Sequence, residues 1–188
     1  MNADRPLVDA VLANDPGAFE RLVREHTGLC WHIIFRMVRH PEDARDLCQE
    51  AFLRVYRHLG QFRYESALKS WIGQIAYSVA LRHLERKRIP LVEAGDDGEM
   101  TERVENVGAD VDVEALCADE QVGRLLTAAL EALAPLPRTI VTLYHLEDLS
   151  LGEIAAITGH PIGTIKSHLF RSRLRLRDLL EPLLADTR

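Results

Sequence analysis

The sequence predicts an all-α protein in which two small helical domains are joined by a flexible acidic linker. Apolar residues recur at helical spacing on both sides of residues 89–119, and strand signals are nearly absent. The acidic side chains are concentrated in that middle segment. A length of 188 residues is enough for one ordinary domain or two small ones.

The composition excludes several classes of protein. Apolar residues make up 47% of the chain and charged residues 28%, which is typical of globular proteins and excludes disorder throughout. No apolar run reaches the roughly 18 to 20 residues of a transmembrane helix, and residues 1–13 lack the pattern of a secretory signal. Cys30, Cys48 and Cys117 show no CxxC spacing, so we expect a reduced, cytoplasmic protein.

The net charge of −6 is unevenly distributed along the chain. Residues 1–88 carry a net charge of +3 and residues 120–188 are neutral, whereas residues 89–119 hold one basic and ten acidic side chains. We expect that segment to be a self-repelling linker, because structureless loops beyond about 12 to 15 residues are uncommon within one domain. The predicted organisation is an N-terminal segment (1–17), a first domain (18–88), the linker (89–119) and a second domain (120–188).

Three helices are predicted in the first domain, over residues 18–38, 42–59 and 68–88. The first helix breaks near Pro41, and a proline suits the first turn of the helix that follows. On the second helix, Phe52 and Tyr56 lie four residues apart, beside carboxylates and off the main apolar stripe. This pair indicates either a partner-binding face or a broad core stripe.

The third predicted helix carries a polar and basic stripe with an aromatic neighbour, Tyr77. The stripe repeats at four-residue steps and consists of Ser70, Gln74, Ser78, Arg82 and Arg86. Such a stripe fits a surface that follows single-stranded nucleic acid and stacks bases. An ordinary solvated helix face has the same pattern.

The second domain is predicted to contain a helix-turn-helix. A helix over residues 137–146 is followed by Ser150-Leu-Gly-Glu153, a capping box that begins a short helix. Gly159 suits the left-handed turn that ends this helix, and Pro161 opens a longer one. The core stripe expected on the longer helix consists of Ile162, Ile165, Leu169, Leu176 and Leu180. A short capped helix, a glycine turn and a longer basic helix are typical of this DNA-binding motif.

The longer helix carries five basic and no acidic residues between positions 163 and 177. Near its N-terminus, Thr164, Ser167 and His168 are placed to reach base edges in a major groove. The basic side chains suited to phosphates are Lys166, Arg171, Arg173 and Arg175. With about four phosphates neutralised, log affinity would fall with log salt at a slope of about −3.6, so we expect this module alone to bind weakly.

These motifs, taken in order, resemble bacterial sigma factors of the sigma-70 family, in the extracytoplasmic-function (ECF) group. The stretch EDARDLCQEAFLRVYRHLGQF (42–62) resembles the part of sigma region 2 that docks on the polymerase clamp. The stretch LKSWIGQIAYSVALRHLERKR (68–88) resembles the part that melts and reads the −10 promoter element. The stretch SLGEIAAITGHPIGTIKSHLFRSRLRLR (150–177) resembles sigma region 4, which reads the −35 element.

The resemblance implies three sets of contact residues. The polymerase contacts it implies are Asp46, Leu47, Gln49, Glu50, Phe52 and Tyr56. The −10 contacts, which include the loop that captures a flipped base, are Phe62, Arg63, Tyr64, Gln74, Tyr77, Ser78, Arg82 and Arg86. The −35 contacts are Thr164, Lys166, Ser167, His168, Arg171, Arg173 and Arg175. The family often has arginine at position 168, and arginine and asparagine at positions 77 and 78, so the promoter sequence stays open.

The resemblance also implies partners. They are core RNA polymerase, through its clamp helices and flap, and promoter DNA. An anti-sigma factor, membrane-anchored in many members of the family, would hold the cytoplasmic chain inactive at the inner face of the membrane until a stress or metal signal. The chain also resembles sigma factors that control heavy-metal-resistance operons, although no residue identifies the signal.

Other functions have weaker support in the sequence. No Gly-rich phosphate loop, GxSxG or HExxH motif is present, so we expect no enzyme, cofactor or small-molecule substrate. His26 and Cys30 are four residues apart, but a metal site needs three or four converging ligands, and none is expected. The alternative function is a standalone helix-turn-helix repressor, which would need a dimer interface and an effector domain.

Overall fold

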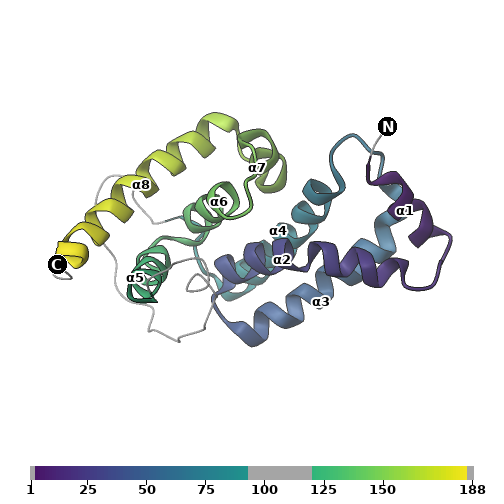
Figure 1. Ribbon diagram of the computed structural model, residues 1–188, viewed down its shortest axis with the longest axis horizontal. Coiled ribbons are helices and arrows are strands. Elements are labelled where there is room, and N and C mark those ends of the chain that lie inside the picture. Colours follow the sequence, from purple (N-terminus) through teal and green to yellow (C-terminus); the bar gives the residue numbers. More distant parts are fainter. Residues whose placement is uncertain (1–2, 93–119, 186–188) are drawn as a thin grey trace.

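The computed structural model describes residues 3–92 and 120–185. Within these ranges the chain forms helices and connecting turns, without a β-strand (Figure 1). The elements are α1 (Arg5–Leu12), α2 (Ala18–Val38), α3 (Pro41–His58), the 3-10 turn η1 (Leu59–Gln61), α4 (Leu68–Lys87), α5 (Glu120–Glu131), α6 (Pro135–His145), α7 (Leu151–Thr158) and α8 (Ile162–Ala185). The predicted acidic linker falls largely on residues 93–119, outside the described residues.

The helices predicted in the first domain are confirmed to within one residue at each end. Arg39 ends α2 in the left-handed conformation, with a φ of 59°. His40 then caps α3, because its Nδ1 accepts a hydrogen bond from the backbone N–H of Asp43. Pro41 occupies the first turn of α3, as its fixed φ favours.

Helix α1 was not predicted from the sequence. It buries Val8 and Val11 and packs against α2 and η1. The residue that precedes α1 also caps the N-terminus of α4, because the Asp4 carboxylate accepts a hydrogen bond from the backbone N–H of Leu68 at 2.8 Å. The cap residue of α4, Ala67, has no side chain that could do this. An apolar face of two valines is too short to give a clear helical period.

In the second domain the predicted capping box and glycine turn both form. The Ser150 side chain accepts from the Glu153 backbone N–H, the Glu153 side chain accepts from the Ser150 backbone N–H, and Gly159 has a φ of 73°. Helix α5 was not predicted, and α6 begins two residues earlier than expected, at Pro135. The expected burial of Ile162 is wrong, because this first residue of α8 is 46% exposed.

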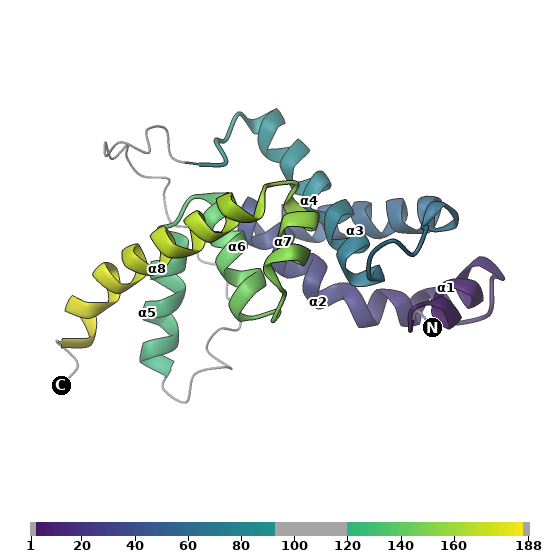
Figure 2. The same ribbon diagram turned by 90° about the horizontal axis from the view of Figure 1, so that it is seen from above.

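The two domains share one continuous hydrophobic core. Helix α6 packs on α2, and α7 packs on α4, so α6 and α7 lie beside these two helices in both views (Figures 1 and 2). The buried Arg138 guanidinium on α6 donates to the backbone carbonyl of Arg36 at 2.7 Å and to that of Leu130 at 3.1 Å. Burial, with nearby arginines, lowers the pKa of Arg138 to about 9.

Candidate polymerase and nucleic-acid interface

The outward face of α3 combines polar side chains with one exposed leucine. Asp46 and Gln49 are exposed, and Glu50 forms an ion pair with Arg54 one turn later. Leu53 follows Gln49 by one turn and is 55% exposed. An exposed apolar side chain among polar ones is a feature of protein-binding surfaces. Leu53 was not expected here, because a leucine in an amphipathic helix is ordinarily assigned to the core.

Of the two alternatives for the aromatic pair on α3, the structure supports the core stripe for Phe52 and a surface position for Tyr56. Phe52 is 8% exposed and Leu47 is 6% exposed, and both belong to the core. Tyr56 is 49% exposed, and its ring packs edge-on against Phe19 of α2 with the centroids 5.0 Å apart. The broad core stripe is therefore the correct interpretation of Phe52, and Tyr56 remains on the surface. Leu47 and Phe52 are core residues rather than accessible contacts.

An aromatic cluster fills the loop before α4. Phe62 is 7% exposed, and its ring centroid lies 4.8 Å from that of Tyr64 and 5.3 Å from that of Trp71. Tyr64 adopts a φ of 59°, and the Arg5 guanidinium of α1 lies 5.1 Å from its ring centroid. Phe62, expected at the surface for base capture, is instead a buried support of this cluster. Arg63 beside it is exposed.

The polar stripe of α4 is split between two environments. Ser78, Arg82 and Arg86 are exposed, and Gln74 is half-buried. Tyr77 is 4% exposed, its hydroxyl is buried without a partner, and burial raises its pKa to about 12. The expectation that Tyr77 lies beside the exposed stripe is wrong, because it turns toward the core. Ser70 is also buried.

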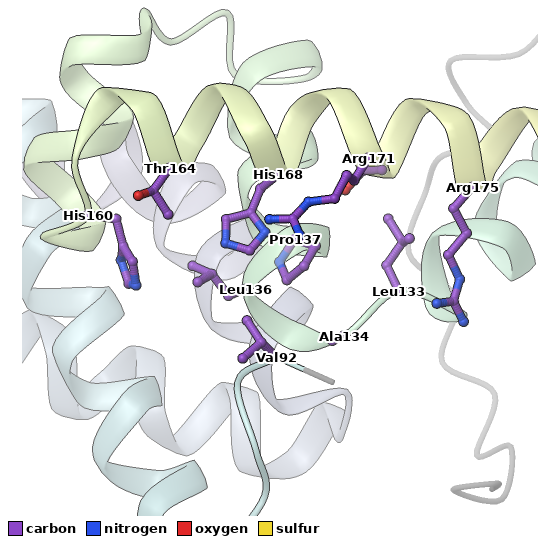
Figure 3. Close-up of a pocket in the computed structure, with 11 residues that line it drawn as sticks. Val92, Leu133, Ala134, Leu136, Pro137, His160, Thr164, His168, Arg171 and Arg175 are labelled. Carbon is purple, nitrogen blue, oxygen red and sulfur yellow. The ribbon is translucent and has the colours of Figure 1, made fainter. Parts of the chain in front are cut away.

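One face of α8 lines a cavity of about 500 Å³. Figure 3 shows Thr164, His168, Arg171 and Arg175 along this face. Opposite them lie Leu133 and Ala134 of the α5–α6 turn and Leu136 and Pro137 of the first turn of α6. Burial, together with the nearby His160, lowers the pKa of His168. A neutral imidazole can donate to and accept from base edges, but it makes no charged contact with a phosphate.

The rest of the α8 surface places polar and apolar side chains side by side. Lys166 and Ser167 are exposed as expected. Phe170 is 64% exposed, the highest exposure among the large apolar side chains of the described residues. Arg173 lies apart from the other predicted −35 residues, since its guanidinium is 5.4 Å from the Tyr144 ring centroid of α6. Phe170 was not predicted as a contact residue, because it lies outside the core stripe of α8 and its exposure depends on which elements pack against the helix.

The cysteines of the first domain are packed rather than reactive. Cys30 is fully buried and Cys48 is half-buried. Burial raises the pKa of both thiols, that of Cys48 to about 11. Within residues 3–92 and 120–185 no group of three metal-ligating side chains is present.

Family models match both domains. Residues 22–89 match "Sigma-70 region 2", and residues 123–176 match "Sigma-70, region 4". The RNA polymerase sigma-H factor of Pseudomonas aeruginosa is 33% identical over 187 residues, which cover 97% of this chain and 96% of that protein. The chain belongs to the sigma-70 family, in its ECF group. The ECF RNA polymerase sigma-E factor of Escherichia coli K12 is also 33% identical, over 96% of each chain.

Solved structures show the same fold as this sigma factor. CnrH, in complex with the cytosolic domain of CnrY, matches 96% of this chain and 98% of that chain, with a TM-score of 0.66 and 20% identity. The sigma factor RpoE of Bartonella quintana, in complex with the anti-sigma factor NepR, matches 88% of this chain and 98% of that chain, with a TM-score of 0.61 and 24% identity.

The family places the helix-turn-helix of this sigma factor in region 4 and α2 to α4 in region 2. The alternative function as a standalone repressor is not supported, because the first domain is a sigma region. Among the described residues, no helix is both long and apolar enough to cross a membrane.

Proposed function

We propose that this sigma factor contacts core RNA polymerase through the outward face of α3 and promoter DNA through the exposed faces of α4 and α8. The observation that carries the proposal is that one chain holds regions 2 and 4 in order, each with an exposed polar or basic helix face. Region 2 would lie on the clamp helices and the −10 strand. Region 4 would lie on the flap and the −35 duplex.

For the polymerase, the proposed contact is a small apolar centre with a polar rim. Leu53 and the Tyr56 ring supply exposed apolar area, and Asp46, Gln49 and Glu50 lie beside them on α3. Burial of a few central side chains supplies most of the free energy of such contacts, while the rim sets the orientation.

For the −10 element, the proposed contacts are the exposed residues Arg63, Ser78, Arg82 and Arg86, with Gln74 at the edge. Cationic side chains would follow the backbone of the separated strand. A flipped base costs a few kcal/mol of lost stacking. The Tyr64–Trp71 side of the aromatic cluster is the proposed place where stacking recovers part of that cost, since both rings are only partly buried.

For the −35 element, the N-terminal half of α8 is proposed to enter the major groove. Ser167, Thr164 and the neutral His168 would reach base edges, and Phe170 offers an apolar contact to a thymine methyl group. The proposed phosphate contacts are Lys166, Arg171, Arg173 and Arg175.

We further propose that an anti-sigma factor regulates this chain. The chain's family and its fold, shared with CnrH and RpoE, support this regulation. An anti-sigma factor anchored in the inner membrane would keep the sigma factor beside that membrane until release. Cell fractionation before and after induction tests this location: a chain that never co-sediments with membranes contradicts it.

In-vitro transcription with purified core polymerase and a promoter library tests the proposed function. We expect promoter-specific transcripts only when this protein is added, and their shared −35 and −10 sequences define its specificity. The proposal would be contradicted if the protein bound DNA but neither bound core polymerase nor produced transcripts.

A further inference from the structure

Helix α1 and the residue before it contact the α4 end of the aromatic loop at three places. The Asp4 carboxylate accepts a hydrogen bond from the backbone N–H of Leu68 at 2.8 Å. The Arg5 guanidinium lies 5.1 Å from the centroid of the Tyr64 ring. The Tyr64 hydroxyl donates to the Asp9 carboxylate at 3.4 Å. The three contacts come from one short stretch of chain, so this stretch acts on the loop as a unit.

Tyr64 has a backbone conformation that needs support from its surroundings. Its φ of 59° lies in the left-handed region, which bulky side chains rarely adopt because Cβ crowds the backbone. Such a conformation persists only where neighbouring groups hold it. The buried Phe62 ring supports Tyr64 at a centroid distance of 4.8 Å, and Arg5 and Asp9 add contacts from α1. The position of the Tyr64 ring therefore depends on α1 as well as on the loop.

The first turn of α4 also depends on a residue far away in the sequence. Its cap residue, Ala67, has no side-chain acceptor, and Asp4 supplies one from 64 residues away. The backbone N–H of Trp71 donates to the Ala67 carbonyl in this same turn, at 3.2 Å. The Trp71 ring lies 5.3 Å from that of Phe62. Asp4 thus stabilises the turn that carries the second exposed ring of the cluster.

These contacts bear on the cost of capturing a base. A base that leaves the stack loses free energy, which contacts with the protein must recover. Rings that are already in place need no ordering when the base arrives, so less of the contact energy is lost. The match to sigma-70 region 2 begins at residue 22, so α1 precedes the matched region.

We propose that α1 is a positioning element for base capture, in which Asp4, Arg5 and Asp9 hold the Tyr64 and Trp71 rings ready to stack on an unpaired base of the −10 strand. The inference rests on the proposed function of the aromatic cluster in the −10 contact. The three positioning residues act through Tyr64 and through the first turn of α4. They should therefore affect strand opening and leave polymerase binding unchanged.

Four variants of the full chain separate this role from a general loss of stability. Asp4→Ala removes the acceptor for the Leu68 N–H, whereas Asp4→Asn keeps an oxygen that can accept. Arg5→Met removes the cation beside the Tyr64 ring at similar length. The matched control is Asp15→Ala, which removes an exposed carboxylate from the turn between α1 and α2.

Strand opening is measured with core polymerase on a promoter from the library that carries the fluorescent base 2-aminopurine in its −10 element. We expect Asp4→Ala to lower the equilibrium constant for opening about fivefold, the size of a lost helix cap. Arg5→Met should lower it about threefold, the size of a lost cation–ring contact. Asp4→Asn and Asp15→Ala should behave like wild type, and all variants should bind core polymerase equally.

A second set of promoters carries one abasic nucleotide at a time in the non-template −10 strand. A variant that is merely less stable loses opening by the same factor on every promoter. A positioning effect disappears where the captured base is absent, so Asp4→Ala and wild type should open one promoter of the set equally. Chemical denaturation of each variant gives its stability independently.

Two results would overturn the positioning role: equal opening of the unmodified promoter by Asp4→Ala and wild type, or a loss in Asp4→Ala that persists on every abasic promoter. In both cases wild type still opens the promoter, and the proposed function stands. If wild type binds no polymerase and opens no promoter, the proposed function itself fails, and the positioning role fails with it.

Discussion

Leu53 is the residue on α3 whose exposure has no explanation within the chain. It is 55% exposed, one turn from Gln49 and among polar neighbours. A leucine that a partner covers contributes about 1 to 2 kcal/mol to binding. Its exposure also means that replacing it leaves the core of the free chain intact.

We therefore expect Leu53→Ala to weaken binding to core polymerase about tenfold while leaving the midpoint of chemical unfolding unchanged. The matched control is Leu12→Ala, since Leu12 is 49% exposed and lies on α1. Equal binding by the Leu53 variant and wild type would remove Leu53 from the polymerase contact.

Phe170 of α8 is, like Leu53, a large apolar residue on the surface, and it is 64% exposed. We expect Phe170→Ala to reduce affinity for the −35 element by about 1 kcal/mol, the free energy of burying roughly one methyl group, most strongly where the site has a thymine methyl group. The measurement is binding of the polymerase complex to promoter fragments that carry thymine or uracil at each −35 position. Leu179→Ala, farther along the same helix and 36% exposed, should have no such effect.

At the scale of elements, α4 shows how one helix serves two surfaces. Ser78 and Arg82 face solvent, while Gly73 and Tyr77 are buried on another side. Gly73 lies against Ile157 of α7, which brings region 4 onto this helix. The position of the proposed −10 contact residues is thus tied to the packing of the opposite side of α4.

The capping box of α7 is the local feature that begins the helix-turn-helix. Ser150→Ala removes the acceptor for the Glu153 N–H and should lower the free energy of unfolding by about 1 kcal/mol. Glu153→Gln keeps a side chain that can accept from the Ser150 N–H and should cost less. Chemical denaturation measures both, and an equal loss for the two variants would contradict a capping role.

At the scale of the molecule, the contact between region 2 and region 4 should depend on pH through Glu147 of the α6–α7 turn. The Glu147 carboxylate accepts a hydrogen bond from His32 Nδ1 of α2 and lies 3.6 Å from Lys69 Nζ of α4. The pKa of Glu147 lies below its ordinary value of 4.5, chiefly because His32 donates a hydrogen bond to it, and Lys69 adds to the effect. A carboxyl with a lowered pKa stabilises this contact above its ordinary pKa, and this contribution is lost as pH falls through the lowered value.

We expect the free energy of unfolding of wild type to decrease as pH falls from about 6 to about 3.5, by more than that of Glu147→Gln. The glutamine variant lacks this ionisation, so it reports the effect of all other carboxyl groups. Chemical denaturation across the titration makes the comparison. Identical profiles for the two proteins would show that Glu147 does not stabilise the contact between the regions.

Most of the helices and the helix-turn-helix were predictable because their evidence is local. Each of these signals acts within a few residues of its own position in the chain. They are the 3.6-residue period, Pro41, the Ser150 capping box and Gly159. Helix α1 was missed because its buried apolar face, Val8 and Val11, is short. Its other stabilising contacts join residues far apart in sequence, such as the hydrogen bond between Asp4 and Leu68.

The sequence by itself determined the all-α class, the order of the helices other than α1 and α5, and the sigma-70 resemblance, since these depend on spacing along the chain. The tertiary structure decided which edge of each stripe is buried. Phe52 and Tyr77 face the core, whereas Leu53 and Phe170 face solvent. Helical periodicity gives the angle between two side chains, but the boundary of the buried face depends on which elements pack against the helix. The packing of α7 on α4 likewise joins residues far apart in sequence, which no local pattern encodes.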